Sequence, residues 1–383
     1  MTLLVVSTLT VMAGATIAPS LPAMQFHFAN IPNSPYLVRL ILTIPALSIA
    51  IGAPFLGVVS DRLGRKPLLL ASLLLYGLAG SSGTWLNSIG LILVGRALLG
   101  ISVAGVMITT IALIADYYSG DERGQFLGLQ SAFMALGGVF FLAVGGFLAD
   151  FYWRMPFLIY LTAWGLVPFV LFLLPEPQNS DAATDATVIT LDEPQTLPTQ
   201  LLWLTYAIAL ASQIVFYIIP TQLPFYLQQL ANTSASQSGL AIALATFSAA
   251  ISSLSYQRIK SGQTFIGMYA LSFINMAVGY IIIALAQGLV TALLGLAIAG
   301  LGLGLLMPNM NFCLTSIVPS AVRGRVLSGL TTSFFLGQFL SPLVSQPLSQ
   351  LTSLGATYGF AGAFMALLGA IALLVWWNGN QSS

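Results

Sequence analysis

Twelve long apolar runs constrain the fold of this chain more than any motif does. They lie at about 3–24, 36–59, 67–86, 89–115, 125–148, 156–174, 200–224, 236–255, 263–286, 289–318, 326–348 and 355–377. Each is long enough to cross a hydrocarbon layer of about 30 Å as a helix that rises about 1.5 Å per residue. Because this layer offers the backbone no other hydrogen-bond partner, each run should be helical despite its glycines and prolines. The sequence predicts an all-α integral membrane protein with twelve transmembrane helices.

Composition excludes several classes of protein. Charged residues make up 5% of the chain and hydrophobic residues 57%, whereas a soluble domain carries about 25% charge. A net charge of +1 provides no basic surface for nucleic acid. We find no metal-ligand cluster and no nucleophile motif, and the single cysteine, Cys313, is expected to be a buried apolar residue. We therefore expect no metal, no cofactor and no enzymatic activity.

The basic residues predict the orientation in the membrane. Loops that follow even-numbered spans carry most of them, namely Arg62, Arg65, Lys66, Arg123, Arg258, Lys260, Arg323 and Arg325. The other side carries only Arg39 and Arg154. Since cytoplasmic loops are enriched in lysine and arginine, the first set of loops and both termini should be cytoplasmic. We expect a multi-pass protein of the cell (inner) membrane, and nothing demands more than a monomer.

The chain divides into two halves. Residues 175–199 are polar, with five acidic residues and no basic one, which favours a flexible cytoplasmic linker over a binding segment. The linker separates residues 1–174 from residues 200–383. A shift of 200 residues places Gly100 on Gly300 and Gly137 on Gly337. This weak repeat predicts two six-helix bundles related by pseudo-symmetry.

Four charges are concentrated in one tight loop between the second and third spans. The sequence there is Gly57-Val-Val-Ser-Asp-Arg-Leu-Gly-Arg-Lys66. It resembles the G-x-x-x-D-R-x-G-R-[RK] loop of the major facilitator superfamily, and it matches at Gly57, Asp61, Arg62, Gly64, Arg65 and Lys66.

The resemblance implies a conformational switch. Asp61 would meet the start of the eleventh span, near residues 326–329, where a helix N-terminus attracts negative charge. Gly57 would permit close approach of the two helices, and Arg65 would pair with Asp116 at the end of the fourth span. The contact of Asp61 with the eleventh span would close the cytoplasmic side of the protein in one state and break in the other. The alternative is that these charges only anchor the topology.

Arg96 is a second candidate. It begins an R-x-x-x-G pattern that ends at Gly100 in the fourth span, with Leu99 where the superfamily often has glutamine. The resemblance implies a role in proton or substrate coupling. The alternative is an arginine that reaches water at the nearby membrane surface.

The fifth span bears on antiport. Its glycines, ending at Gly145 and Gly146, resemble the motif of antiporter members, but Phe141 and Leu142 replace the expected Gly-Pro pair. The full-length pattern is most similar to the twelve-span drug and metabolite:proton antiporters, although this motif is only half present.

Polar residues well inside the spans are candidates for a substrate cavity. They are Gln130, Gln213, Tyr217, Gln222, Asn309 and Asn311. Each could instead bond a neighbouring helix. No Asp or Glu lies inside a span, so a cation would find no buried partner. We therefore expect a neutral or amphipathic solute, or an anion attracted to Arg96 or Arg39.

These observations favour a secondary active transporter that moves a small solute by alternating access, with proton-coupled efflux as the leading form. Its partners would be the solute, protons and the lipid bilayer. An uncoupled facilitator and a transporter-like sensor or binding protein stay open as alternatives. The sequence does not identify the solute.

Overall fold

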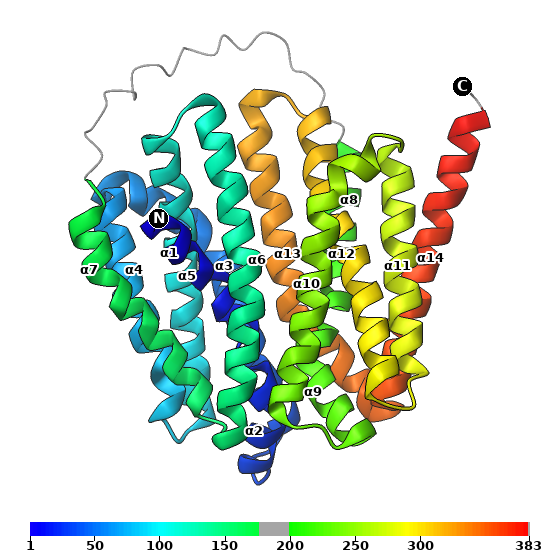
Figure 1. Ribbon diagram of the computed structural model, residues 1–383, viewed down its shortest axis with the longest axis horizontal. Helices are drawn as coiled ribbons and strands as arrows, with labels where there is room; N and C mark the ends of the chain where they lie inside the picture. Colours follow the sequence, from blue (N-terminus) through cyan, green and yellow to red (C-terminus); the bar gives the residue numbers. More distant parts are fainter. Residues whose placement is uncertain (176–198, 382–383) are drawn as a thin grey trace.

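The computed structural model describes residues 1–175 and 199–381, and every regular element in these ranges is a helix (Figure 1). Within these ranges twelve spans are long and apolar enough to cross a membrane, as predicted. The linker predicted over 175–199 falls almost wholly on residues outside the described ranges.

The first half contains six spans. Its elements are α1 (Thr2–Ala15), η1 (Ala18–Ser20), α2 (Leu21–His27), α3 (Ser34–Leu63), α4 (Arg65–Gly80), η2 (Ser81–Thr84), α5 (Ile89–Tyr117), α6 (Gly120–Phe151), η3 (Met155–Leu161) and α7 (Thr162–Leu173). The second half repeats this number of spans with α8 (Thr199–Phe216), α9 (Ile218–Ala231), α10 (Ala235–Lys260), α11 (Phe265–Ala284), α12 (Leu289–Ile317), α13 (Ser320–Leu351) and α14 (Leu354–Gln381).

The two halves form two bundles, seen in Figure 1 on the left and on the right, with α6, α10 and α13 in the middle. We call the surface at the upper side of Figure 1 the basic face, because the loop of Arg62 to Lys66 lies there. The opposite face, at the lower side, carries the end of α2.

Equivalent contacts hold each bundle together. Gly100 of α5 packs against the backbone of α3, and Gly300 of α12 packs in the same way against α10. The hydroxyl of Tyr76 donates to Leu9 O of α1 at 2.7 Å, and that of Tyr280 donates to Val215 O of α8 at 2.7 Å. Small residues allow such close helix packing where lipid provides no hydrophobic drive. The repeat seen in the sequence is thus a repeat of packing.

The first span of each half is broken. Helix α1 stops at Ala15, before Pro19, and helix α8 stops at Phe216, before Pro220. Proline cannot donate to a carbonyl four residues earlier, and in a membrane the freed backbone groups need other partners. The two breaks face each other, since a Cβ added at Gly14 would lie 3.0 Å from the Tyr217 hydroxyl.

Candidate functional site at the interface between the bundles

The charged loop is fixed inside the first bundle. Arg65 forms the expected ion pair with Asp116 and also donates to Ala112 O of α5 at 3.2 Å. Lys66 donates to Leu174 O, at the end of α7, at 2.7 Å. A cation is favourable at a helix C-terminus, where carbonyls lack intrahelical donors. These contacts tie the start of α4 to α5 and α7.

The other half of the loop is free of the second bundle. Asp61 and Arg62 are exposed. Neither side chain forms a hydrogen bond or an ion pair with a described residue. Nothing lies within 4 Å of a Cβ added at Gly57, so no helix approaches it closely. Gly64, with φ of 87°, adopts a conformation that favours glycine between α3 and α4. The contact between Asp61 and α13 that the resemblance implies is not formed in this conformation.

Arg96 lies in the interior of the first bundle. It is 0% exposed, so its side chain does not reach water at the membrane surface. Its Nε donates to Ile41 O at 2.9 Å, and its Nη2 donates to Ala13 O at 2.8 Å. Ile41 lies four residues before Pro45, which has no N–H for that carbonyl, and Ala13 lies in the last turn of α1. Arg96 therefore satisfies backbone groups that two helix irregularities leave open.

One nitrogen of this guanidinium, with its two N–H donors, is unused. The Nη1 of Arg96 is buried without a hydrogen-bond partner, and so is the hydroxyl of Tyr160. The Tyr160 ring lies 5.1 Å from the guanidinium carbon. A buried unpaired donor is costly, which makes it an attractive contact for an acceptor that arrives later.

Two predicted cavity residues flank the break in the seventh span. Gln213 is 1% exposed, with its Nε2 3.6 Å from the sulfur of Met307 and its Oε1 3.4 Å from Gln338 Nε2. Tyr217 is 7% exposed and lies against Gly14 of the first bundle. Both contacts to Gln213 are long, so its amide can exchange them for another partner.

The other predicted cavity residues bond within their own bundles or at a helix surface. Gln130 donates to Ser7 Oγ at 2.7 Å and joins α6 to α1. Asn309 is fully buried, and its amide accepts from Tyr256 and donates to Phe265 O. Asn311 is exposed and donates to Met307 O at 3.0 Å. The structure thus places Asn309 and Gln130 where their amides are already used.

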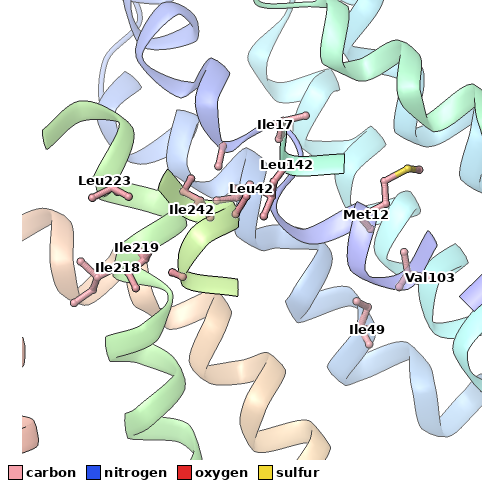
Figure 2. Packing of buried hydrophobic residues seen from close by; sticks show 14 of the residues in the cluster. Met12, Ile17, Leu42, Ile49, Val103, Leu142, Ile218, Ile219, Leu223 and Ile242 are labelled. Atoms are coloured by element: carbon pink, nitrogen blue, oxygen red, sulfur yellow. The ribbon is translucent and has the colours of Figure 1, made fainter. Parts of the chain in front are cut away.

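Gln222 joins the two bundles near the opposite face. It accepts from Nε of Arg39 at 2.9 Å and donates to Gln346 Oε1 at 3.1 Å. In the same region Leu42 and Leu142 of the first bundle and Ile219 and Ile242 of the second belong to one buried cluster (Figure 2). Apolar packing and the hydrogen bonds of the Gln222 and Gln346 amides together hold the bundles in contact near the opposite face.

Asp150 is a cross-bundle residue that the motifs did not indicate. Its carboxylate accepts from Ala235 N at 2.7 Å and from Ser236 N at 3.2 Å, at the N-terminus of α10. Ser234 caps the same helix by accepting from Gln237 N at 3.2 Å. The sequence contained two signals for this contact. They are an acid at the end of the fifth span and an S-x-x-Q capping box at the start of the eighth.

The hydrogen bonds and the cation–π contact between the described parts of the two bundles share one location. Among the described residues they are the contacts of Arg39 with Gln222 and Phe225, of Tyr36 with Gln350, and of Asp150 with α10. Each lies in the half of the protein nearer the opposite face. Among the described residues, hydrogen bonds therefore join the bundles at the opposite face and not at the basic face. We call these contacts of Arg39, Tyr36 and Asp150 the latch.

The described residues contain no group of three or more His, Cys, Asp or Glu side chains that could hold a metal ion. The arrangement instead provides two bundles, broken helices that meet at their interface, and hydrogen bonds between the bundles near one face. This is the class of helical membrane transporters with two related halves.

The profile of the Major Facilitator Superfamily matches residues 3–342, and the chain belongs to this superfamily. The quinolone resistance protein NorA of Staphylococcus aureus is 24% identical over 341 residues, which cover 86% of this chain and 84% of that protein. The bacillibactin exporter of Bacillus subtilis is 33% identical over 153 residues, which cover 38% of this chain and 37% of that protein. The family is one of transporters and not of enzymes.

Solved structures show the same fold. A D-xylose-proton symporter superposes with a TM-score of 0.80 at 16% identity, covering 96% of this chain and 95% of that chain. A bacterial homolog of the human lysosomal transporter Spinster, in an inward-facing and occupied conformation, gives a TM-score of 0.76 at 15% identity, covering 100% of this chain and 96% of that chain.

Proposed function

We propose that this protein is a secondary active transporter that exports a small amphipathic solute by alternating access, in exchange for protons. The observation that carries the proposal is the one-sided latch: every cross-bundle hydrogen bond among the described residues lies near the opposite face, while Asp61 is unpaired. A rocking-bundle transporter needs two such states, one for each face.

The orientation of the protein in the membrane determines which side this conformation would open to. With the basic face in the cytoplasm of a cell (inner) membrane, as the positive charges favour, the structure is the inward-facing state. In the other state Asp61 would meet the N-terminus of α13 while the contact of Asp150 with α10 breaks. Asp61 and Asp150 would then be two equivalent switches that are used in turn.

The path of the solute follows the meeting point of the broken helices. Gln213 and Tyr217 lie there, and the weak contacts of Gln213 leave its amide free to bind. Arg96, with one unused nitrogen, is the adjacent polar group available for coupling. Gln222 belongs to the latch, and the bonded amides of Asn309 and Gln130 favour a structural role for both.

The direction of transport is supported by the relatives, one named as an exporter and one as a resistance protein. No Asp or Glu lies in the middle of a described span, so proton exchange would have to use another group. An uncoupled facilitator is the second candidate, and this observation favours it.

The test uses purified protein in liposomes that contain a pH dye, with neutral and amphipathic solutes added under an imposed proton gradient. Solute-dependent proton movement supports exchange, whereas solute movement at constant pH identifies a facilitator. Asp61→Asn should fold and lose transport, because the second state loses its switch. Asp121→Asn removes an exposed acid of the same face and should transport normally. Full transport by the Asp61→Asn protein would overturn the switch, and binding without transport by the wild type would support a sensor.

A further inference from the structure

The opposite face contains a pocket whose lining includes neither Gln213 nor Tyr217. Its volume is about 1160 Å³, enough for a drug-sized molecule. Helix α2, the segment before α3, and helix α9 surround it, so both bundles contribute to its walls. Its lining combines aromatic rings, such as Phe26, Trp153 and Phe225, with the amides of Gln25 and Gln228. Among the described residues its lining contains no aspartate, glutamate, lysine or arginine, and His27 is its one basic side chain.

A buried charge lies directly behind this lining. Arg39 is 3% exposed, and its Nη1 donates to Gln25 Oε1 at 2.8 Å and to Pro35 O at 2.8 Å. The ring of Phe225 lies over the guanidinium, 3.9 Å from its carbon. Gln25, Pro35 and Phe225 all line the pocket. A single layer of side chains thus separates the guanidinium from the pocket.

Arg39 has only neutral partners. It contacts two glutamines, one carbonyl and one aromatic ring, and no described carboxylate pairs with it. Arginine stays charged at neutral pH, and burying a charge without an opposite charge is expensive. A carboxylate forms shorter and stronger hydrogen bonds with a guanidinium than an amide does. An anion that reaches Arg39 would therefore displace Gln25 with a net gain.

We propose that this pocket binds a small aromatic carboxylate, with Arg39 as the counter-ion and the rings of Trp153, Phe26 and Phe225 as the apolar wall. This rests on the proposed function, for which it names a substrate class: amphipathic anions, contacted at the opposite face. Neutral molecules of the same shape fit the wall but gain nothing from Arg39.

The guanidinium of Arg39 contacts both the pocket lining and Gln222 of the second bundle. The Nε of Arg39 holds Gln222 of the second bundle, and Gln222 in turn donates to Ser345 Oγ at 3.2 Å and to Gln346. A carboxylate prefers to accept from two guanidinium nitrogens at once. A carboxylate that takes Nε together with Nη2 competes with Gln222, whereas one that takes Nη1 together with Nη2 displaces Gln25 and leaves the contact with Gln222 in place.

The experiment measures equilibrium binding of tritiated 1-naphthoate and 1-naphthamide to the full-length protein in nanodiscs, with empty nanodiscs subtracted. These probes share one ring system and differ in charge. We expect 1-naphthoate to bind about tenfold more tightly, the usual advantage of a charged over a neutral hydrogen bond. Arg39→Gln should abolish this preference, while Arg123→Gln, which removes an exposed arginine of the basic face, should keep it.

Gln25→Leu covers the case in which Arg39→Gln does not fold. It removes the neutral competitor on the pocket side and leaves the contact of Arg39 with Gln222 in place. We expect tighter binding of 1-naphthoate and unchanged binding of 1-naphthamide. Equal affinities of the two probes for the wild type would overturn the proposal, and so would a carboxylate preference that survives Arg39→Gln or does not change in Gln25→Leu.

These outcomes are separable from those of the transport test. Transport in liposomes without a carboxylate preference in nanodiscs would refute the anion site alone. A carboxylate preference in a protein that moves no solute would refute the transporter and leave the site in place.

Discussion

The contact between Asp150 and α10 should set the balance between the two states of the protein, and its effect can be measured. The carboxylate accepts from Ala235 N at 2.7 Å and from Ser236 N at 3.2 and 3.3 Å. It thereby satisfies two of the N-terminal donors of α10 and interacts with the helix dipole. In the state open to the opposite face, water would replace it.

The magnitude follows from the geometry and the exposure of this site. Asp150 is exposed, so solvent screens its charge and the lower values apply. Asp150→Asn removes the charge but keeps one acceptor, a loss of about 0.5 kcal/mol. Asp150→Ala removes every contact, a loss of about 1 kcal/mol, as for other helix caps. The ratio of the two states should shift about twofold in the first variant and about fivefold in the second.

Distances between spin labels at Glu122 and Gln257 report this ratio. Both residues are exposed at the basic face, one on α6 and one on α10. Labels are attached in a Cys313→Ser background, since Cys313 is the only native cysteine. When the opposite face opens, the bundles approach at the basic face, so the short-distance population should grow from wild type to Asp150→Asn to Asp150→Ala.

Asp121→Asn is the matched control, because it removes an exposed acid at the other end of the same helix. It should leave the distances unchanged. An unchanged distribution in an Asp150→Ala protein that melts like the wild type would refute the reasoning, as would an equal shift in the control.

Three further predictions concern packing and polar contacts. Gly100→Val should lower the melting temperature, at a cost of about 1–3 kcal/mol, because its side chain would overlap the backbone of α3. Gly128→Val should melt like the wild type, since nothing lies within 4 Å of its Cβ position. Tyr76→Phe and Tyr280→Phe should each cost about 0.6 kcal/mol in unfolding titrations, and unequal losses would contradict the equivalence of the two bundles. Arg96→Lys should fold but lose most of its transport in the liposome assay, since an ammonium cannot hold two helix carbonyls as the planar guanidinium does; full transport would contradict this.

Much of the architecture could be predicted from the sequence. The twelve spans and their order follow from hydropathy, because each must satisfy its backbone alone inside the bilayer. The largest error in a boundary concerns the seventh span, predicted to end at residue 224, whereas its helix continues to Ala231. Hydropathy marks the part of a helix in contact with lipid, while α9 continues as a helix that packs against the other bundle.

The ion pair of Arg65 with Asp116 was implied by the resemblance of the charged loop to that of the superfamily, and the structure contains it. The break in the first span and the break in the seventh were not predicted, although Pro19 and Pro220 were visible in the sequence. Proline interrupts some membrane helices and only kinks others, and the neighbouring helices decide which outcome occurs.

Only the tertiary structure determined which way the polar side chains face. Asn309 and Gln222 are both amides inside spans, yet one is bonded within its bundle and the other joins the two bundles. Arg39 was expected at a membrane surface, yet it is buried behind a pocket that both bundles build. In a helix that is apolar on all sides the pattern of hydropathy does not fix the rotation about its axis. That rotation is set by the shapes of the neighbouring helices, which the linear sequence of one span does not contain.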